Sequence, residues 1–170
     1  MCGQSGMFVG SNTIKSEIDT ARKLMILNTF RGEHACGMFD YVPGHKDETL
    51  FWKSADHPFD FILEEFDQLP DTRWKDKEPR IIATHCRNAT KGKLSEQNAH
   101  PLSVGHILGM HNGTIEKAFE GSDSKETDSE AFYTLLNAKG LDYALEAIKN
   151  KGAAFAFIWM DLDSHTMNFI

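Results

Sequence analysis

The sequence has little of what marks several large classes of protein. Its 3 cysteines, Cys2, Cys36 and Cys86, include no CxxC pair, so neither a disulfide framework nor a cysteine-type zinc site is expected. Basic residues are outnumbered: 18 Lys and Arg stand against 25 Asp and Glu, which gives a formal net charge of -7. This balance argues against binding to nucleic acid or to an anionic membrane through bulk electrostatics.

The chain also lacks a long hydrophobic run. Its longest apolar stretch, 152–160, is far too short to span a bilayer, and the N-terminus has neither the basic nor the apolar region of a secretory signal. Free thiols fit a reducing compartment, so the sequence predicts a cytoplasmic protein. Of the 170 residues, 41% are hydrophobic and 25% charged, and no linker or repeat interrupts them; we therefore expect one globular domain over 1–170.

The pattern of apolar and turn-forming residues predicts strands at both ends of the chain and helices between them. Strands are expected at 2–9, 35–42, 49–52, 80–86, 104–110, 153–161 and 166–170, and helices at 14–30, 60–66, 128–137 and 141–150. Thr13 is expected to cap the first helix, 43–47 to form a hairpin turn, and the polar runs 69–80 and 88–98 to be connections. This order indicates an α+β protein with two sheets between helical layers.

Cys2 is the first candidate for catalysis. If Met1 is removed, which the small Cys2 side chain permits, the thiol is a nucleophile beside a free α-amine that can serve as its base. Such an amine titrates at about pH 7.7–8.0, whereas an amide nitrogen under a retained methionine is not basic. The alternative is that Cys2 is only a small apolar residue at the start of a strand.

Two segments that contain an arginine suggest parts of a site. Segment 31–37, RGEHACG, lies at a helix-to-strand joint where glycines permit close backbone approach, although alone it is better interpreted as a helix C-cap. Segment 84–90, THCRNAT, is followed by NAHP at 98–101 and places Arg87 just after a strand. Arg87 offers planar bidentate donors for a carboxylate, and its alternative is an ordinary surface ion pair.

Two further segments suit substrate binding. In HNG at 111–113, the Asn112 amide and the Gly113 N–H can form an oxyanion hole; the alternative is a β-turn, because Asn-Gly is a common hairpin dipeptide. TDSE at 127–130 opens a helix, where Asp128 is either the N-cap or a carboxylate that receives a substrate ammonium. The 8 histidines have no helical ligand spacing such as HxxxH, so we expect no metal.

Together these segments resemble the glutaminase domain of class II glutamine amidotransferases. A cysteine at position 2, RGxxxxG, THxRxAT followed by NAHP, HNG and DSE occur in that family's order, and they cover nearly the whole chain. The resemblance is closest to the branch of glucosamine-6-phosphate synthase and phosphoribosyl pyrophosphate amidotransferase. It implies an N-terminal-nucleophile hydrolase with a four-layer αββα sandwich, abbreviated at the C-terminus and with no synthetase domain.

The resemblance also implies a role for each matching residue. Cys2 is the nucleophile, Asn112 and Gly113 are the oxyanion hole, Arg87 binds the glutamine α-carboxylate, Asp128 binds its α-amino group, Asn88, Thr90 and Lys91 form the loop beside Arg87, His100 supports that loop, and Arg31 lies near the nucleophile. Two departures stand out. His34 and Ala35 replace an Asp and a Ser of the family pattern, and Asn88 replaces an aromatic residue.

The function implied is hydrolysis of the glutamine side-chain amide through a glutamyl thioester on Cys2, without metal or cofactor. Glutamate is released, and ammonia passes to a separate acceptor enzyme as the partner. Two alternatives stay open: a freestanding amidohydrolase acting on a γ-glutamyl or other small amide, and a catalytically silent glutamine-binding module.

Overall fold

The computed structural model describes residues 1–10, 15–45, 49–64 and 78–170. Within them the chain forms two four-stranded antiparallel sheets. The first, in the order β1-β4-β2-β3, contains β1 (Gly3–Val9), β2 (Ala35–Tyr41), β3 (Leu50–Ser54) and β4 (Arg80–Arg87). The second, in the order β5-β6-β7-β8, contains β5 (Leu102–Val104), β6 (Ile107–Ile115), β7 (Ala153–Asp161) and β8 (Thr166–Phe169).

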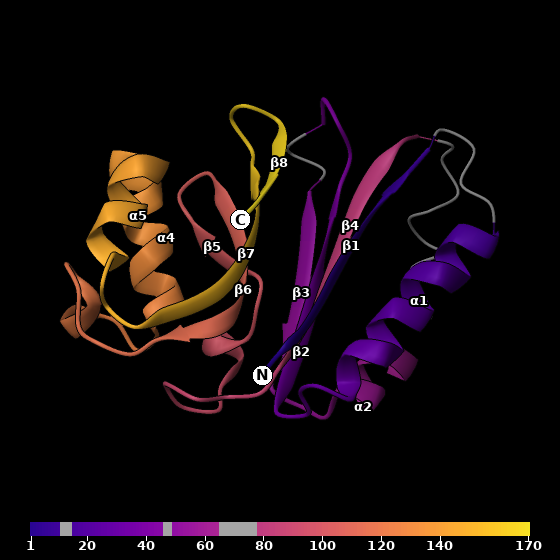
Figure 1. Ribbon diagram of the computed structural model, residues 1–170. Helices are drawn as coiled ribbons and strands as arrows, with labels where there is room; N and C mark the ends of the chain where they lie inside the picture. Colours follow the sequence, from indigo (N-terminus) through magenta and orange to yellow (C-terminus); the bar gives the residue numbers. More distant parts are fainter. Residues whose placement is uncertain (11–14, 46–48, 65–77) are drawn as a thin grey trace.

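Helices cover the outer face of each sheet (Figure 1). On the first sheet, α1 (Lys15–Thr29) packs on β1 and β4, and α2 (Pro58–Glu64) packs on α1 and β2. On the second, α4 (Asp128–Lys139) packs on β5 and β6, and α5 (Leu141–Ile148) packs on α4. Short 3₁₀ helices, η3 (Glu96–Asn98) and η4 (Ser122–Ser124), lie in the connections. The predicted α+β class with two sheets is confirmed; the N-terminal-nucleophile sandwich stays a prediction.

Side chains that alternate along the strands build the core between these layers. Along β6, Ile107 and Ile115 belong to the cluster under α4 and α5, whereas Leu108 and Met110 belong to the cluster between the two sheets. The two-residue period of a strand causes this alternation. A further cluster, which includes Met25, fills the space between α1 and the first sheet. Each fully buried apolar side chain of this size contributes about 1.5–3 kcal/mol.

Most predicted elements are confirmed with small shifts at their ends, but the strand expected at 104–110 is wrong. The structure has two strands there, β5 and β6, joined by a turn at Gly105 and His106. Gly105 has a φ of 59°, and a Cβ at this position would lie 2.2 Å from Asn137 Oδ1. Glycine is therefore required for the turn. The pattern of apolar residues did not predict this turn.

The ends of other elements also bear on the predictions. β6 continues through HNG to Ile115, so the β-turn interpretation of Asn112 and Gly113 is wrong. The hairpin between β2 and β3 is confirmed by their antiparallel pairing, and the 88–98 connection contains η3 at its end. Thr13, residues 46 and 47 of the hairpin turn, residues 65 and 66 of the predicted helix, and 69–77 of the polar connection lie outside the described residues.

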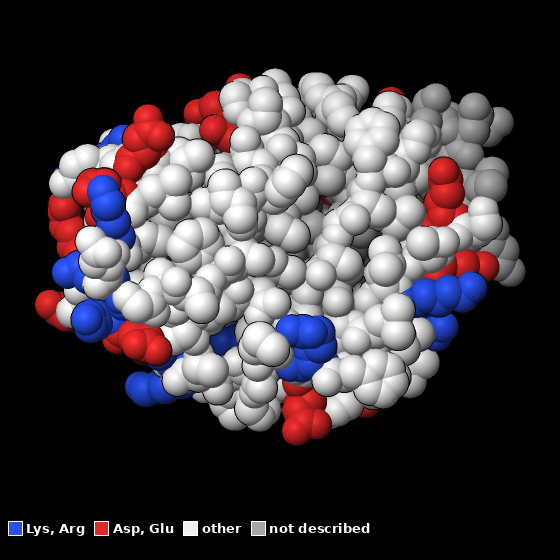
Figure 2. Space-filling model, viewed as in Figure 1, with Lys and Arg blue, Asp and Glu red and all other residues white. Residues whose placement is uncertain are grey.

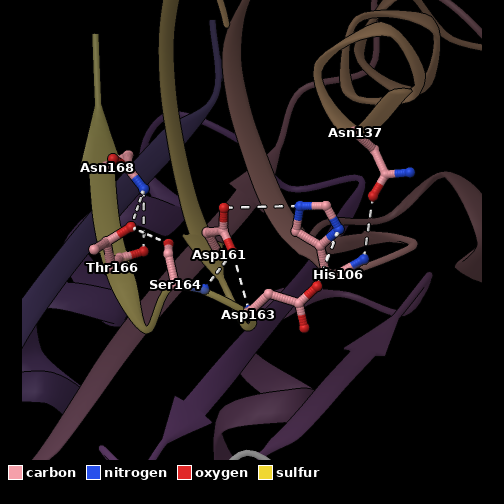
Figure 3. A network of polar contacts seen from close by, with 7 residues as sticks. All are labelled: His106, Asn137, Asp161, Asp163, Ser164, Thr166 and Asn168. Carbon is pink, nitrogen blue, oxygen red and sulfur yellow. Dashed lines mark hydrogen bonds and ion pairs between the residues drawn. The ribbon is translucent and has the colours of Figure 1, made fainter. Parts of the chain in front are cut away.

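His106 fastens the two hairpins of the second sheet to each other and to α4 (Figure 3). Its backbone N–H donates to Asn137 Oδ1 at 3.2 Å, and its carbonyl accepts from Leu162 N at 2.9 Å. Its ring nitrogens lie 3.7 Å from carboxylate oxygens of Asp161 and Asp163. The turn between β7 and β8 is thereby held against the turn between β5 and β6.

On the face viewed in Figure 2, most Lys, Arg, Asp and Glu side chains lie at the margins and the middle is largely uncharged. A groove of about 280 Å³ lies between the edge strands β1 and β8, and apolar residues line it: Gly6, Met7, Phe8, Ile81, Ile158, Met167 and Phe169. None of the helices in the described ranges combines the length and the hydropathy that crossing a membrane requires.

Candidate functional site

Cys2 lies immediately before β1, and strand pairing places its side chain against the end of β4. The register pairs Gly3 with Cys86, so Cys2 reaches the residues that follow Cys86. Asn88 N–H donates to Cys2 Sγ at 3.3 Å, and Sγ lies 3.7 Å from Asn88 O. Arg31 Nε donates to the Cys2 carbonyl at 3.0 Å, which places Arg31 beside the backbone of Cys2. The side chain of Cys2 is held by contacts as well as by burial.

The surroundings of Cys2 keep its sulfur protonated. Burial raises the pKa of the Cys2 thiol above its usual value, and the Asn88 N–H and the Arg87 charge oppose this shift only in part. A thiol with a raised pKa needs a base at the moment it attacks a carbonyl carbon. Any nucleophilic chemistry at Cys2 therefore depends on a proton acceptor close to Sγ.

Cys2 opens into a cavity of about 20 Å³ between the ends of the two sheets. Its lining residues are Cys2, Arg87, Asn88, Thr90, Lys91, His100, His111, Gly113, Thr127, Asp128 and Ser129. The structure thus brings together the predicted Cys2, Arg87, Asn88, Thr90, Lys91, His100, Gly113 and Asp128. Of the predicted residues, Arg31 and Asn112 do not line the cavity.

Arg87, the last residue of β4, is a buried cation. Only 4% of its surface is exposed, and its guanidinium donates to the carbonyls of Lys91 and Lys93 at 2.5 and 3.1 Å. Burial lowers the pKa of Arg87, and the neighbouring Cys2 and Asp128 oppose that shift. The surface ion pair considered for Arg87 is wrong, because the side chain is buried and organises the loop that follows it.

Asp128 supplies negative charge on the opposite wall. It is the first residue of α4, and Thr127 is the N-cap, whose hydroxyl accepts from Glu130 N at 3.1 Å. The N-cap interpretation of Asp128 is therefore wrong. Its carboxylate instead accepts from Ile115 N at 2.7 Å and from Ser129 N at 3.1 Å, which joins α4 to the end of β6.

Segment 31–37 follows the end of α1 and contacts the loop after β4. A Cβ on Gly32 would lie 2.5 Å from Arg87 C and from Cys86 O, so only glycine allows this approach. His34 N–H donates to Arg87 O at 3.0 Å, and His34 Nδ1 accepts from Ala89 N at 3.0 Å. The C-cap interpretation is thus incomplete. His34, a departure from the family pattern, positions the loop that holds Cys2.

The loop after Arg87 is fastened across the cavity to the second sheet. Lys91 Nζ donates to the carbonyl of Ile115, and to that of Glu116 at 3.2 Å. The hydroxyls of Thr90 and Thr114 lie 3.2 Å apart. These bonds hold the loop against the second sheet, and the cavity beneath the loop is small.

Asn112 and Gly113 occupy opposite faces of β6. Met110 faces the first sheet, and side chains two residues apart on a strand point to the same side. Asn112 therefore also faces the first sheet. Gly113 lines the cavity, and a Cβ on it would lie 2.0 Å from Ala154 O, which explains the requirement for glycine. Gly113 is therefore at the cavity, whereas Asn112 is not among the residues that line it.

Sequence reasoning gave no role to His85 and His111, two buried histidines that neighbour the predicted His100 or each other. His85 Nε2 lies 3.1 Å from His111 O, and the rings of His85 and His100 are 4.4 Å apart. Burial lowers the pKa of His85 to about 3, of His111 to about 4, and of His100 well below its usual value, so all three are neutral at pH 7. No group of His, Cys, Asp or Glu in the described ranges could hold a metal ion.

The signal for the missed residues was present in the motifs. His111 belongs to HNG and Ser129 to TDSE, yet only the asparagine, glycine and aspartate of these motifs were given roles. Their contact depends on how β6 packs against the start of α4, which no motif specifies.

Part of the chain is similar to glutamine–fructose-6-phosphate aminotransferases (isomerizing). It is 33% identical over 106 residues to that of Aquifex aeolicus (strain VF5), a match that covers 53% of this chain and 18% of the relative. It is 37% identical over 92 residues to that of Salmonella typhi (45% and 15%), and 34% identical over 79 residues to that of Gluconobacter oxydans (strain 621H) (44% and 13%).

These matches concern only a piece of each relative. The aligned part spans less than a fifth of the length of these curated proteins. No protein-family model matches the chain. The similarity is consistent with a domain related to glutamine amidotransferases.

Proposed function

We propose that this chain is a class II glutaminase domain that hydrolyses the side-chain amide of glutamine through Cys2. The observation that carries the proposal is one cavity lined by the buried Cys2 thiol, the Arg87 cation and the Asp128 anion. An amino acid has a carboxylate and an ammonium on one carbon, and two opposite charges can fix both. The partial similarity to aminotransferases whose name includes glutamine supports the same substrate.

Arg87 and Asp128, the two residues proposed to bind the charged groups of glutamine, can each form further hydrogen bonds. A guanidinium has five N–H donors, and Arg87 uses two groups on backbone carbonyls. A carboxylate has about four acceptor sites, and Asp128 uses two on backbone N–H groups. The α-carboxylate of glutamine binds Arg87, its ammonium binds Asp128, and its amide is presented to Cys2. Asn88, Thr90, Lys91 and His100 complete the wall of this pocket.

The chemistry needs cleavage of the peptide bond between Met1 and Cys2. The freed amine of Cys2 then takes the thiol proton while Sγ bonds to the amide carbon, and Asn112 and Gly113 donate to the oxyanion. The C–N bond breaks, and the proton held by the amine leaves with ammonia. Water next attacks the glutamyl thioester, which releases glutamate and restores the thiol. No step requires a metal or a cofactor.

The wider parts of the proposal follow from this chemistry. The two sheets between two helix pairs (Figure 1) support an N-terminal-nucleophile αββα sandwich. Ammonia is delivered to a separate acceptor enzyme in the cytoplasm. Arg31, which bonds the Cys2 carbonyl, keeps the nucleophile in place.

The volume of the cavity sets a condition on this function. A space of about 20 Å³ accommodates roughly one water molecule, so glutamine enters only after the loop held by Lys91 moves away. In the catalytically silent alternative, the domain binds glutamine after this movement but Cys2 does not react with it. The two candidates differ in whether Cys2 attacks the amide of the bound glutamine.

A glutamine-analogue electrophile separates these candidates. Protein without Met1 is incubated with the electrophile, and intact mass and peptide mapping locate the adduct, with Cys2→Ala as the control. The proposed function predicts one adduct, on Cys2, protection by glutamine, and release of glutamate from glutamine by the untreated protein. Absence of an adduct and of glutamate would favour the silent module, whereas turnover of other γ-glutamyl amides but not glutamine would favour the freestanding amidohydrolase.

A further inference from the structure

A second polar pair, His111 and Ser129, lines the cavity beside Asp128. His111 Nδ1 lies 2.8 Å from Ser129 Oγ, and its ring stacks on Phe157 with the centroids 4.2 Å apart. The side chain is only 2% exposed, so the hydrogen bond and the stack fix its ring. Its other nitrogen, Nε2, is buried and has no hydrogen-bond partner among the described residues. Buried polar atoms are nearly always partnered, so this nitrogen is a candidate to bind a ligand.

Nε2 lies close to Gly113, which lines the cavity together with Asp128. A Cβ on Gly113 would lie 2.8 Å from Nε2, so this ring nitrogen borders the glycine. Burial lowers the pKa of His111 to about 4, although the Asp128 charge opposes the shift. The ring is therefore neutral near pH 7, with one nitrogen that donates and one that accepts.

We propose that His111 is a further substrate-binding residue, whose Nε2 accepts an N–H from the α-ammonium group held by Asp128. The inference rests on the proposed function. An ammonium group has three N–H donors, and the two Asp128 oxygens already accept from Ile115 and Ser129. A lone pair beside that carboxylate completes the ammonium's set of acceptors. The proposal requires the tautomer in which Nδ1–H donates to Ser129 Oγ and Nε2 is unprotonated; Ser129 is then the positioning residue.

The test compares two ligands that differ only at the α-carbon. Glutaramate is glutamine with its α-amino group replaced by hydrogen. The dissociation constants of both are measured by titration in Cys2→Ala protein, with and without His111→Asn. An asparagine amide can replace Nδ1 in the contact with Ser129 but does not reach the position of Nε2. His106→Asn, at the half-exposed turn, is the matched control.

The expected result is a loss specific to the ammonium group. His111→Asn weakens glutamine binding by about tenfold or more, as for a hydrogen bond to a charged group, and leaves glutaramate binding unchanged. His106→Asn changes neither. Equal weakening of both ligands by His111→Asn would overturn the inference, because the ring would then only shape the cavity. If the parent binds no glutamine at all, the proposed function fails and the inference with it.

A second measurement needs no substitution at His111. In ¹⁵N NMR, the imidazole signals distinguish a protonated from an unprotonated ring nitrogen. We expect Nε2 of His111 to be unprotonated, with a signal that moves on addition of glutamine but not of glutaramate. A proton on Nε2 in the glutamine complex would overturn the inference even if the His111 variant does not fold.

Discussion

Replacement of Arg87 by lysine tests the carboxylate grip while the positive charge is kept. The guanidinium bonds two loop carbonyls at 2.5 and 3.1 Å, and a single ammonium group cannot reproduce both contacts of the planar fork. Loss of one hydrogen bond to a charged group costs about 1.5–3 kcal/mol. In a domain of this size each kcal/mol lowers Tm by roughly 2–4 °C, so we expect a decrease of roughly 3–12 °C.

Binding should weaken as well, because the second bond of the fork to the substrate carboxylate is also lost. The same energy corresponds to roughly 10- to 100-fold in the dissociation constant of glutamine. Calorimetry on Cys2→Ala protein measures binding without turnover, and thermal unfolding is followed in the same samples. Both quantities are needed because Arg87 also holds the loop.

Arg80→Lys is the matched control. Arg80 begins the same strand that Arg87 ends and is equally buried. It forms an ion pair with Asp40 at 2.6 Å and does not line the cavity. We expect this variant to lose stability without losing affinity for glutamine. Arg87→Lys protein that binds glutamine as tightly as the parent would refute the assignment of Arg87 to the carboxylate.

Four other results are expected. Protein that retains Met1 should be inert, because its Cys2 nitrogen is an amide; full activity in protein shown by mass spectrometry to keep Met1 would remove the proposed base. Asn112→Ala should lower kcat by about 100- to 1,000-fold, whereas a change confined to KM would mark Asn112 as a binding residue only. Asp128→Asn should mainly weaken glutamine binding in calorimetry, and unchanged affinity would show that Asp128 is misassigned. The pKa of His111 is lowered from 6.5 to about 4, so between these pH values the native state binds fewer protons than the unfolded state. The free energy of unfolding in urea should therefore decrease as the pH falls from 6.5 to about 4. A constant free energy of unfolding over that interval would contradict a buried neutral ring.

Local sequence patterns predicted the elements that carry the site but not how they meet. Short apolar runs, an apolar helical face and turn signals were enough for β1, α1, β4 and α4, because these patterns lie within each segment. The turn at Gly105 was missed because the sequence pattern shows neither its positive φ nor the close approach of Asn137, which is far away in the sequence. The two strands β5 and β6 were consequently merged into one.

In the candidate site, too, single motifs were predicted from the sequence but contacts between distant segments were not. Cys2, Arg87 and Asp128 could be named because their motifs occur in a familiar order, and the structure brings all three to one cavity. The pair of His111 and Ser129 could not be named, because it forms only when β6 and the start of α4 are packed together. The loop contact of His34 with Ala89 is equally nonlocal, since it joins segments on either side of β2, β3 and α2.

A glutamyl thioester on Cys2 is the most direct evidence for or against the proposed function. Protein that lacks Met1 is mixed with glutamine, quenched in acid within a single turnover, digested, and analysed by mass spectrometry. We predict a glutamyl adduct on the peptide that begins with Cys2, formed and lost at the rate of glutamate release and absent from Cys2→Ala protein. Glutamate release at the same rate with no adduct on Cys2 at any quench time, or undiminished release by Cys2→Ala protein, would contradict covalent catalysis by this residue.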